Sequence, residues 1–217
     1  MARGVRRLSS LTQSAGSARQ RGLVSLAKVE DATMSTNTLL TAEEFLRSGP
    51  ETDRFELVRG ELVPMPPPGD KHGLVCMNIG YILNGYVDRI GYGFVLGNDA
   101  GIITRKSPDT VRGVDVSLFL KPEWADGRVP EGYTDVPPDL AVEVRSPGQS
   151  WGEVTAKVAE YLAMGVKIVW VADPKTRRVT VFTPEEEPMV HAAESEWDGG
   201  QVLPGLKCSG TRVFRGV

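Results

Sequence analysis

Two acidic residues stand inside hydrophobic segments of this chain, and they are its first candidates for chemistry. Asp115 interrupts GVDVSLFL and Glu143 interrupts DLAVEV, and both segments alternate as β-strands do. Because burying an unpaired carboxylate is costly, such positions usually have a cation, a shell of hydrogen bonds or a metal ion beside them. Taken singly, each acid is better explained as a salt-bridged strand residue or an edge residue in water. Two such acids on neighbouring strands would instead make a divalent-cation site.

A lysine gives this pair of acids a third partner. Lys157 lies at the border of the apolar stripe in WGEVTAKVAEYLAMG, which has the spacing of a helix. From that border its ammonium group can reach a neighbouring site. The alternative is a snorkelling side chain, with the stem on the core and the charge in water.

The segments around these residues predict an α/β fold with a mixed central β-sheet flanked by helices and an N-terminal β-hairpin. A strand at 140–144, a helix at 151–164 and a strand at 168–171 form one unit that implies parallel pairing. Thr41 and Glu44 have the spacing of a capping box, which predicts a short helix through Arg47. The other expected elements are a hairpin at 55–58 and 61–65, a helix at 71–89, strands at 93–96, 101–105, 114–120 and 179–182, and a C-terminal hairpin or edge strand.

Length and composition set the limits of the molecule. The 217 residues suffice for one ordinary domain, and a hydrophobic fraction of 41% is enough for one core. No apolar run is long enough for a membrane-spanning helix. Two cysteines and two histidines cannot supply a four-ligand zinc site of the usual spacing or a disulfide framework. A reduced, cytoplasmic setting is therefore expected.

Residues 1–33 form a basic head that differs in composition from the rest. They resemble a mitochondrial transit peptide, but we favour an upstream extension of the reading frame or a disordered tail, with a single domain over 34–217. Since the whole chain has a formal charge of −3, the part beyond the head is more acidic still. A net-acidic body argues against a broad phosphate-tracking surface, so contact with nucleic acid would need a local basic patch or a metal ion.

An ordered set of segments carries a family resemblance. These segments are FELVRGEL, GVDVSLF, DLAVEVRSP, KVAEYLAMGVKIVWVADP and LPGL. Together they resemble the Uma-type (Uma two) family of restriction-endonuclease-like proteins in the PD-(D/E)XK nuclease superfamily, over essentially residues 38–215. The resemblance implies a restriction-endonuclease-like fold with a metal-dependent phosphodiesterase centre.

The resemblance also implies roles for individual residues. Asp115 matches the motif aspartate, Glu143 matches the second acid, and Lys157 matches a lysine that has moved to the following helix. The implied cofactor is Mg²⁺ or Mn²⁺, held by Asp115, Glu143 and the backbone carbonyl of Val144. Glu56 matches a further acid that would bind a second ion or orient the ligands of the first. The implied partner is nucleic acid, DNA before RNA, with no membrane and with a homodimer expected from the habit of the superfamily.

Two features, Arg145 and the acidic body of the chain, keep a second function open. Arg145 takes the place of the usual E-x-K lysine, and a guanidinium group cannot act as a base. His72 is interpreted as a helix-start histidine in water, and Arg112 as one of several solvated loop charges. With Arg145 and the acidic body, the alternative function is a non-catalytic module that binds nucleic acid or protein. Acids that face one cavity beside the Lys157 ammonium would favour the nuclease, whereas acids on opposite sheet faces would favour the binding module.

Overall fold

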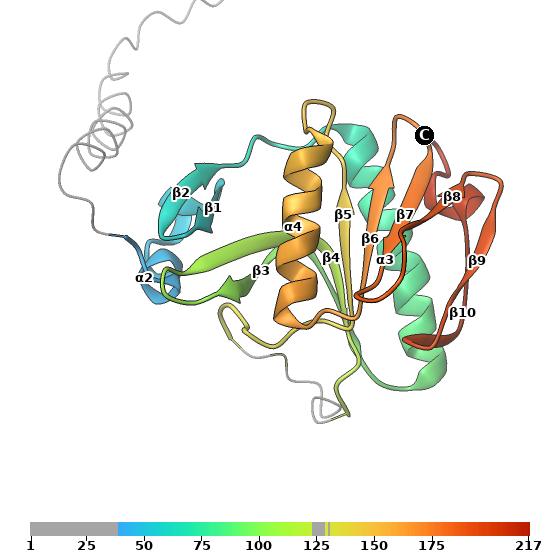
Figure 1. Ribbon diagram of the computed structural model, residues 1–217, viewed down its shortest axis with the longest axis horizontal. Helices are drawn as coiled ribbons and strands as arrows, with labels where there is room; N and C mark the ends of the chain where they lie inside the picture. The colour runs from blue at the N-terminus through green and yellow to red at the C-terminus, as the bar shows by residue number, and fades with distance from the viewer. Residues whose placement is uncertain (1–38, 123–128, 130) are drawn as a thin grey trace, which may run out of the picture. The chain divides into compact units, whose positions relative to one another are not determined.

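An eight-stranded mixed sheet forms the centre of the protein (Figure 1). The computed structural model describes residues 39–122, 129 and 131–217, so the predicted head at 1–33 lies outside the described residues. The strands of this sheet are β1 (Phe55–Val58), β2 (Glu61–Pro64), β3 (Phe94–Arg105), β4 (Thr110–Phe119), β5 (Leu140–Val144), β6 (Ile168–Asp173), β7 (Arg178–Phe182) and β8 (Met189–Ala192). Their order is β2-β1-β4-β5-β6-β7-β8, and β3 also pairs with β4.

The pairing confirms the predicted mixed sheet. Among the described strands, only β5 and β6 pair in parallel, and all the other neighbouring pairs of this sheet are antiparallel. The two strands predicted at 93–96 and 101–105 are one long strand, β3, with an irregularity between them. β8 was not predicted, because its side chains are mostly exposed and have no clear apolar alternation.

Helices cover both faces of the sheet. They are α2 (Ala42–Arg47), the 3₁₀ helix η1 (Gly49–Thr52), α3 (Asp70–Ile90), α4 (Trp151–Met164) and α5 (Gly210–Val213). Figure 1 shows α4 in front of the sheet and α3 behind it. No helix within the described ranges combines the length and hydropathy that a membrane span needs.

The parallel connection between β5 and β6 runs through α4. Ser150 begins this helix with a capping box, since its hydroxyl accepts a hydrogen bond from the Glu153 amide at 3.2 Å and the Glu153 carboxylate accepts one from the Ser150 amide at 2.7 Å. Gly165 ends the helix in the left-handed conformation, with φ 104°. Both ends of the helix that carries Lys157 are thus fixed by local chemistry.

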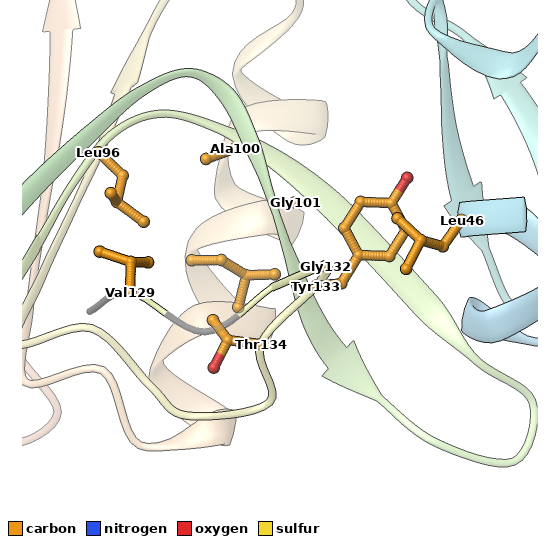
Figure 2. A pocket seen from close by; sticks show the side chains of 9 residues that line it. Leu46, Leu96, Ala100, Gly101, Val129, Gly132, Tyr133 and Thr134 are labelled. Carbon is orange, nitrogen blue, oxygen red and sulfur yellow. The ribbon is translucent and has the colours of Figure 1, made fainter. Parts of the chain in front are cut away.

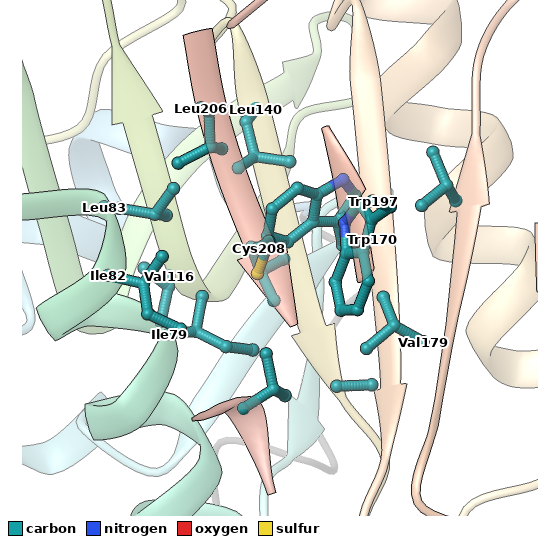
Figure 3. Packing of buried hydrophobic residues seen from close by; sticks show 14 of the residues in the cluster. Ile79, Ile82, Leu83, Val116, Leu140, Trp170, Val179, Trp197, Leu206 and Cys208 are labelled. Carbon is teal, nitrogen blue, oxygen red and sulfur yellow. The ribbon is translucent and has the colours of Figure 1, made fainter. Parts of the chain in front are cut away.

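The described residues form three apolar clusters, and the two larger ones lie against the sheet under α3 and α4. Under α3, residues such as Ile79 and Leu83 pack on Val116 and Val142. The same core extends to a small sheet of β9 (Glu196–Gly199) and β10 (Leu203–Ser209), where Trp197 meets Trp170 edge to face at 5.8 Å (Figure 3). The second core lies under α4 and contains Val154, Val158, Tyr161, Ala141 and Val169.

Strands β1 and β5 pair with different parts of one edge of β4, and the candidate site lies at the gap between them. Because β3 pairs with β4 along its whole length, β1 and β5 share the other edge. β1 pairs there at Val111, and β5 pairs from Val116 to Leu118. Residues 112–115 lie between these pairings, so side chains from three strands can meet at this gap.

Candidate active site

A cavity of about 540 Å³ lies at this gap, and the predicted site residues line it. Its wall includes Glu56 from β1, Asp115 from β4, Glu143 and Val144 from β5, and Lys157 from α4. Residues following the first hairpin and residues of the β5–α4 loop complete the rim. All five residues singled out from the sequence therefore meet in one hollow.

Glu143 lies at the bottom of this arrangement and is buried. Its Oε1 accepts a 2.5 Å hydrogen bond from the Tyr161 hydroxyl, and its Oε2 lies 3.3 Å from Lys157 Nζ. Burial raises the pKa of Glu143 to about 7, although the Lys157 charge acts against this shift. Tyr161 belongs to the apolar stripe of α4, and this position in the sequence gives no sign that its hydroxyl reaches an acid.

Lys157 joins Glu143 to Glu56. Its Nζ lies 2.8 Å from Glu56 Oε1 and 3.3 Å from Glu143 Oε2. Burial alone would lower the pKa of Lys157, but the two facing carboxylates outweigh burial and raise it above its ordinary value. The ammonium group is therefore charged and held inside the cavity, and it does not snorkel into water.

Glu56 has more hydrogen-bond donors than the other acids. Its Oε2 accepts from Arg112 at 2.8 Å, and its Oε1 accepts from the Gly113 amide at 3.2 Å as well as from Lys157. Arg112 also holds Glu160 through two nitrogens, at 2.6 and 2.7 Å. The expectation that Arg112 is a solvated loop charge was wrong, because it lies buried in β4 between two acids.

Asp115 connects β5 to the start of α3. Its Oδ2 accepts a 2.6 Å hydrogen bond from the Val144 amide, and its Oδ1 lies 3.2 Å from His72 Nε2. His72 is only 8% exposed, so its interpretation as a histidine in water was wrong. Burial lowers the pKa of His72, but the hydrogen bond to Asp115 and the charge of Asp115 outweigh it and raise the pKa.

A further acid reaches the site from an irregular part of β3. The register with β4 shifts between Gly97 and Ala100, and Asn98 and Asp99 have φ values of +61° and +55°. Desolvation of the Asp99 carboxyl group, together with the nearby charge of Asp115, raises the pKa of Asp99. Such an irregularity re-aims side chains, and two successive non-glycine residues in this conformation are uncommon. The sequence showed only a break between two predicted strands here.

Arg145 does not take part in the cavity. Its Nη1 donates to Asp173 at 2.7 Å, its Nη2 donates to the Gln149 carbonyl at 2.8 Å, and its guanidinium lies 4.7 Å from the Trp151 ring. It therefore orders the β5–α4 loop at the rim. The cationic side chain that faces Glu143 is Lys157 from α4, whereas Arg145 faces Asp173 and the loop.

A second hollow lacks such chemistry. Figure 2 shows its lining, which among the described residues is mostly apolar and contains no acid, lysine, arginine or histidine. The lining residues are Leu46, Leu96, Ala100, Gly101, Ile102, Val129, Gly132, Tyr133 and Thr134. The titratable groups thus single out the larger cavity.

The sheet, its helices and the acid-lined gap define a nuclease-like α/β protein. Residues 42–211 match the Uma2 family, described as "Putative restriction endonuclease", and the chain belongs to this family. A crystal structure described as "a putative nuclease belonging to DUF820", from Anabaena variabilis ATCC 29413, has a TM-score of 0.66 and 24% identity, with 81% of this chain and 97% of that chain covered. That likeness shows the fold. No curated protein matches the chain.

Proposed function

We propose that this protein is a divalent-cation-dependent nuclease that hydrolyses phosphodiester bonds in DNA. The observation that carries the proposal is the meeting of Lys157 with Glu143 in a cavity that Asp115 also lines. This arrangement favours the nuclease over a non-catalytic binding module, for which acids on opposite faces of the sheet are expected. Membership of a family described as restriction endonucleases supports the choice of DNA.

The charges of the cavity support a need for a cation. Of the described residues, five with acidic side chains line the cavity, and Arg112 and Lys157 are those with a permanent positive charge. The acids are Glu56, Asp99, Asp115, Glu143 and Glu153. A phosphodiester is itself an anion, so it would be repelled from this wall unless further positive charge offset the excess.

The donor atoms fit Mg²⁺ or Mn²⁺. Asp115 and Glu143 offer carboxylate oxygens, which these cations prefer. The Val144 amide points to Asp115, whereas the next amide, that of Arg145, points to β6. Because the N–H and C=O of one strand residue point the same way, the Val144 carbonyl also faces the Asp115 side. A bound cation would acidify a water molecule and offset charge on the phosphate.

The remaining contacts suggest what the side chains do. Lys157 would orient the attacking water or the scissile phosphate, because its ammonium group is held at the cavity wall. Glu56 already accepts from Arg112, Gly113 and Lys157, so we assign it the positioning of Lys157 and not the binding of a second ion. A homodimer stays a prediction, which light scattering of the purified protein tests.

Cleavage of supercoiled plasmid tests this function. We expect nicking with Mg²⁺ or Mn²⁺, none with EDTA, and a loss on the order of 100-fold or more in Glu143→Gln, which keeps the shape of the side chain but removes its charge. Glu185→Gln, in an exposed loop, is the matched control and should cleave as the wild type does. Equal cleavage by wild type and Glu143→Gln would contradict the proposal.

A further inference from the structure

Asp115 also belongs to a group of side chains that could bind a metal ion. The other two members, His72 and Cys76, lie on α3. His72 and Cys76 are one turn apart on α3, so both side chains point from the same face of that helix. One donor atom each from His72, Cys76 and Asp115 lies within 4.8 Å of the other two. Nothing in the proposed hydrolysis uses the histidine or the thiol.

We propose that His72, Cys76 and Asp115 form a second cation site, which binds Zn²⁺ in preference to Mg²⁺ and competes with the catalytic cation for Asp115. The preference follows from the donors, since imidazole nitrogen and thiolate sulfur suit Zn²⁺, whereas Mg²⁺ takes oxygen ligands. Three protein ligands with a fourth position left to water form a common zinc arrangement.

The distances are close to those that such an ion needs. His72 Nε2 and Asp115 Oδ1 are 3.2 Å apart, and two ligands at tetrahedral zinc lie roughly 3.3 Å apart. Cys76 Sγ lies 3.5 Å from the other ring nitrogen, His72 Nδ1, and one donor atom each from Cys76, His72 and Asp115 lies within 4.8 Å of the other two. Because a sulfur and a nitrogen on one tetrahedral zinc lie about 3.5 Å apart, the thiol must move inward by up to about 1 Å and give up its contact with Nδ1. Binding releases the thiol proton to solvent, because the thiolate is the ligand.

The surroundings supply an entry route and an attractive field. His72 and Asp115 line the large cavity, while Cys76 is partly buried behind them on α3. Asp99 on β3 and Glu143 on β5 line the same cavity. A cation that enters from the cavity therefore meets acids before it reaches the nitrogen and sulfur donors.

The expected consequence for cleavage rests on the proposed function, but the binding does not. Asp115 has two carboxylate oxygens, of which Oδ2 is already taken by the Val144 amide. Zinc bound through Asp115 and His72 would thus withdraw a ligand from the Asp115–Glu143 pair. We expect Zn²⁺ to inhibit Mg²⁺-dependent cleavage by wild type, and Cys76→Ala to need about tenfold more Zn²⁺ for the same fractional inhibition.

Cobalt substitution of the full-length protein, without nucleic acid, tests the site directly. Co²⁺ bound by wild type should give a sulfur-to-cobalt charge-transfer band that stoichiometric Zn²⁺ abolishes. Cys76→Ala should lose the band, and His72→Gln should bind Zn²⁺ at least about tenfold more weakly by calorimetry. The chain has one other cysteine and one other histidine, so Cys208→Ala and His191→Gln are matched controls that should keep the wild-type behaviour.

Glu143→Gln separates the two proposals. This variant should lose cleavage and keep both the cobalt band and the zinc affinity. Absence of the band in wild-type protein, or its persistence in Cys76→Ala, would overturn the zinc site. Zinc binding as expected without any cleavage by wild type would overturn the nuclease proposal alone. Thermal unfolding of each variant, recorded with and without Zn²⁺, distinguishes loss of the ligand from loss of the fold, since a ligand raises the Tm of a folded protein that binds it.

Discussion

The acids of the cavity differ in how many hydrogen-bond donors and positive charges each carboxylate receives from the protein. Glu56 receives Arg112, the Gly113 amide and Lys157, so its negative charge is well compensated. Glu143 receives one neutral hydroxyl and a longer contact from Lys157. Asp115 receives one amide and His72. The less compensated pair, Asp115 and Glu143, is therefore the pair that best fits a cation.

The raised pKa of Glu143 predicts a pH dependence of stability. Between its ordinary 4.5 and about 7, the folded protein holds a proton on Glu143 that the unfolded chain has lost. The free energy of unfolding should therefore fall as pH rises through this window, by at most about 1.4 kcal/mol per pH unit from this group. Urea unfolding in EDTA at pH 5, 6 and 7.5 measures the slope.

Glu143→Gln isolates this contribution from those of His72 and Asp99. Its stability should decline less than that of wild type over the same pH range, because glutamine does not titrate. Parallel pH profiles for the two proteins would mean that Glu143 ionises in the fold as freely as in water.

At the scale of elements, the site depends on an opening in one strand edge and on one helix. The gap on β4 between β1 and β5 leaves room for the acids, and α4 delivers Lys157 and Tyr161 to Glu143. The position of α4 is set by the capping box at Ser150, the left-handed Gly165 and the apolar contacts beneath it. Changes at its first turn should therefore reach the cavity.

Removal of the α4 cap should affect activity as well as stability. Ser150→Ala removes the hydroxyl that accepts from the Glu153 amide, which should lower the free energy of unfolding by about 1 kcal/mol. The matched control is Thr41→Ala, which removes the equivalent capping box of α2. Both variants should lose similar stability in urea unfolding, and Ser150→Ala should lose more of its plasmid cleavage. Equal cleavage by the two variants would contradict the prediction that the α4 cap positions the site.

At the scale of the whole molecule, much of the fold followed from local patterns. The strand, helix and strand from 140 to 171 were predictable because apolar alternation, a capping serine and a terminal glycine agree there. The acids Asp115 and Glu143 stood out because strands so apolar seldom contain them. The peripheral β8 and β9 were missed, since short strands with exposed side chains have little apolar pattern.

The parts of the site that were missed depend on tertiary contacts. His72 and Cys76 are ordinary residues of an amphipathic helix until α3 brings them beside Asp115. Arg112 could not be distinguished from a solvated charge without Glu56 and Glu160, which lie far from it in sequence. Asp99 reaches the cavity through an irregularity in β3 that the sequence revealed only as a break between strands.

The central claim is that Asp115, Glu143 and Val144 hold the cation of a hydrolytic centre. Anomalous diffraction from crystals soaked in Mn²⁺ locates this ion directly. We predict a peak within coordination distance of the Asp115 and Glu143 carboxylates and the Val144 carbonyl, lost in Glu143→Gln crystals soaked in the same way. A well-ordered wild-type cavity without such a peak, or a peak unchanged in Glu143→Gln, would contradict the claim.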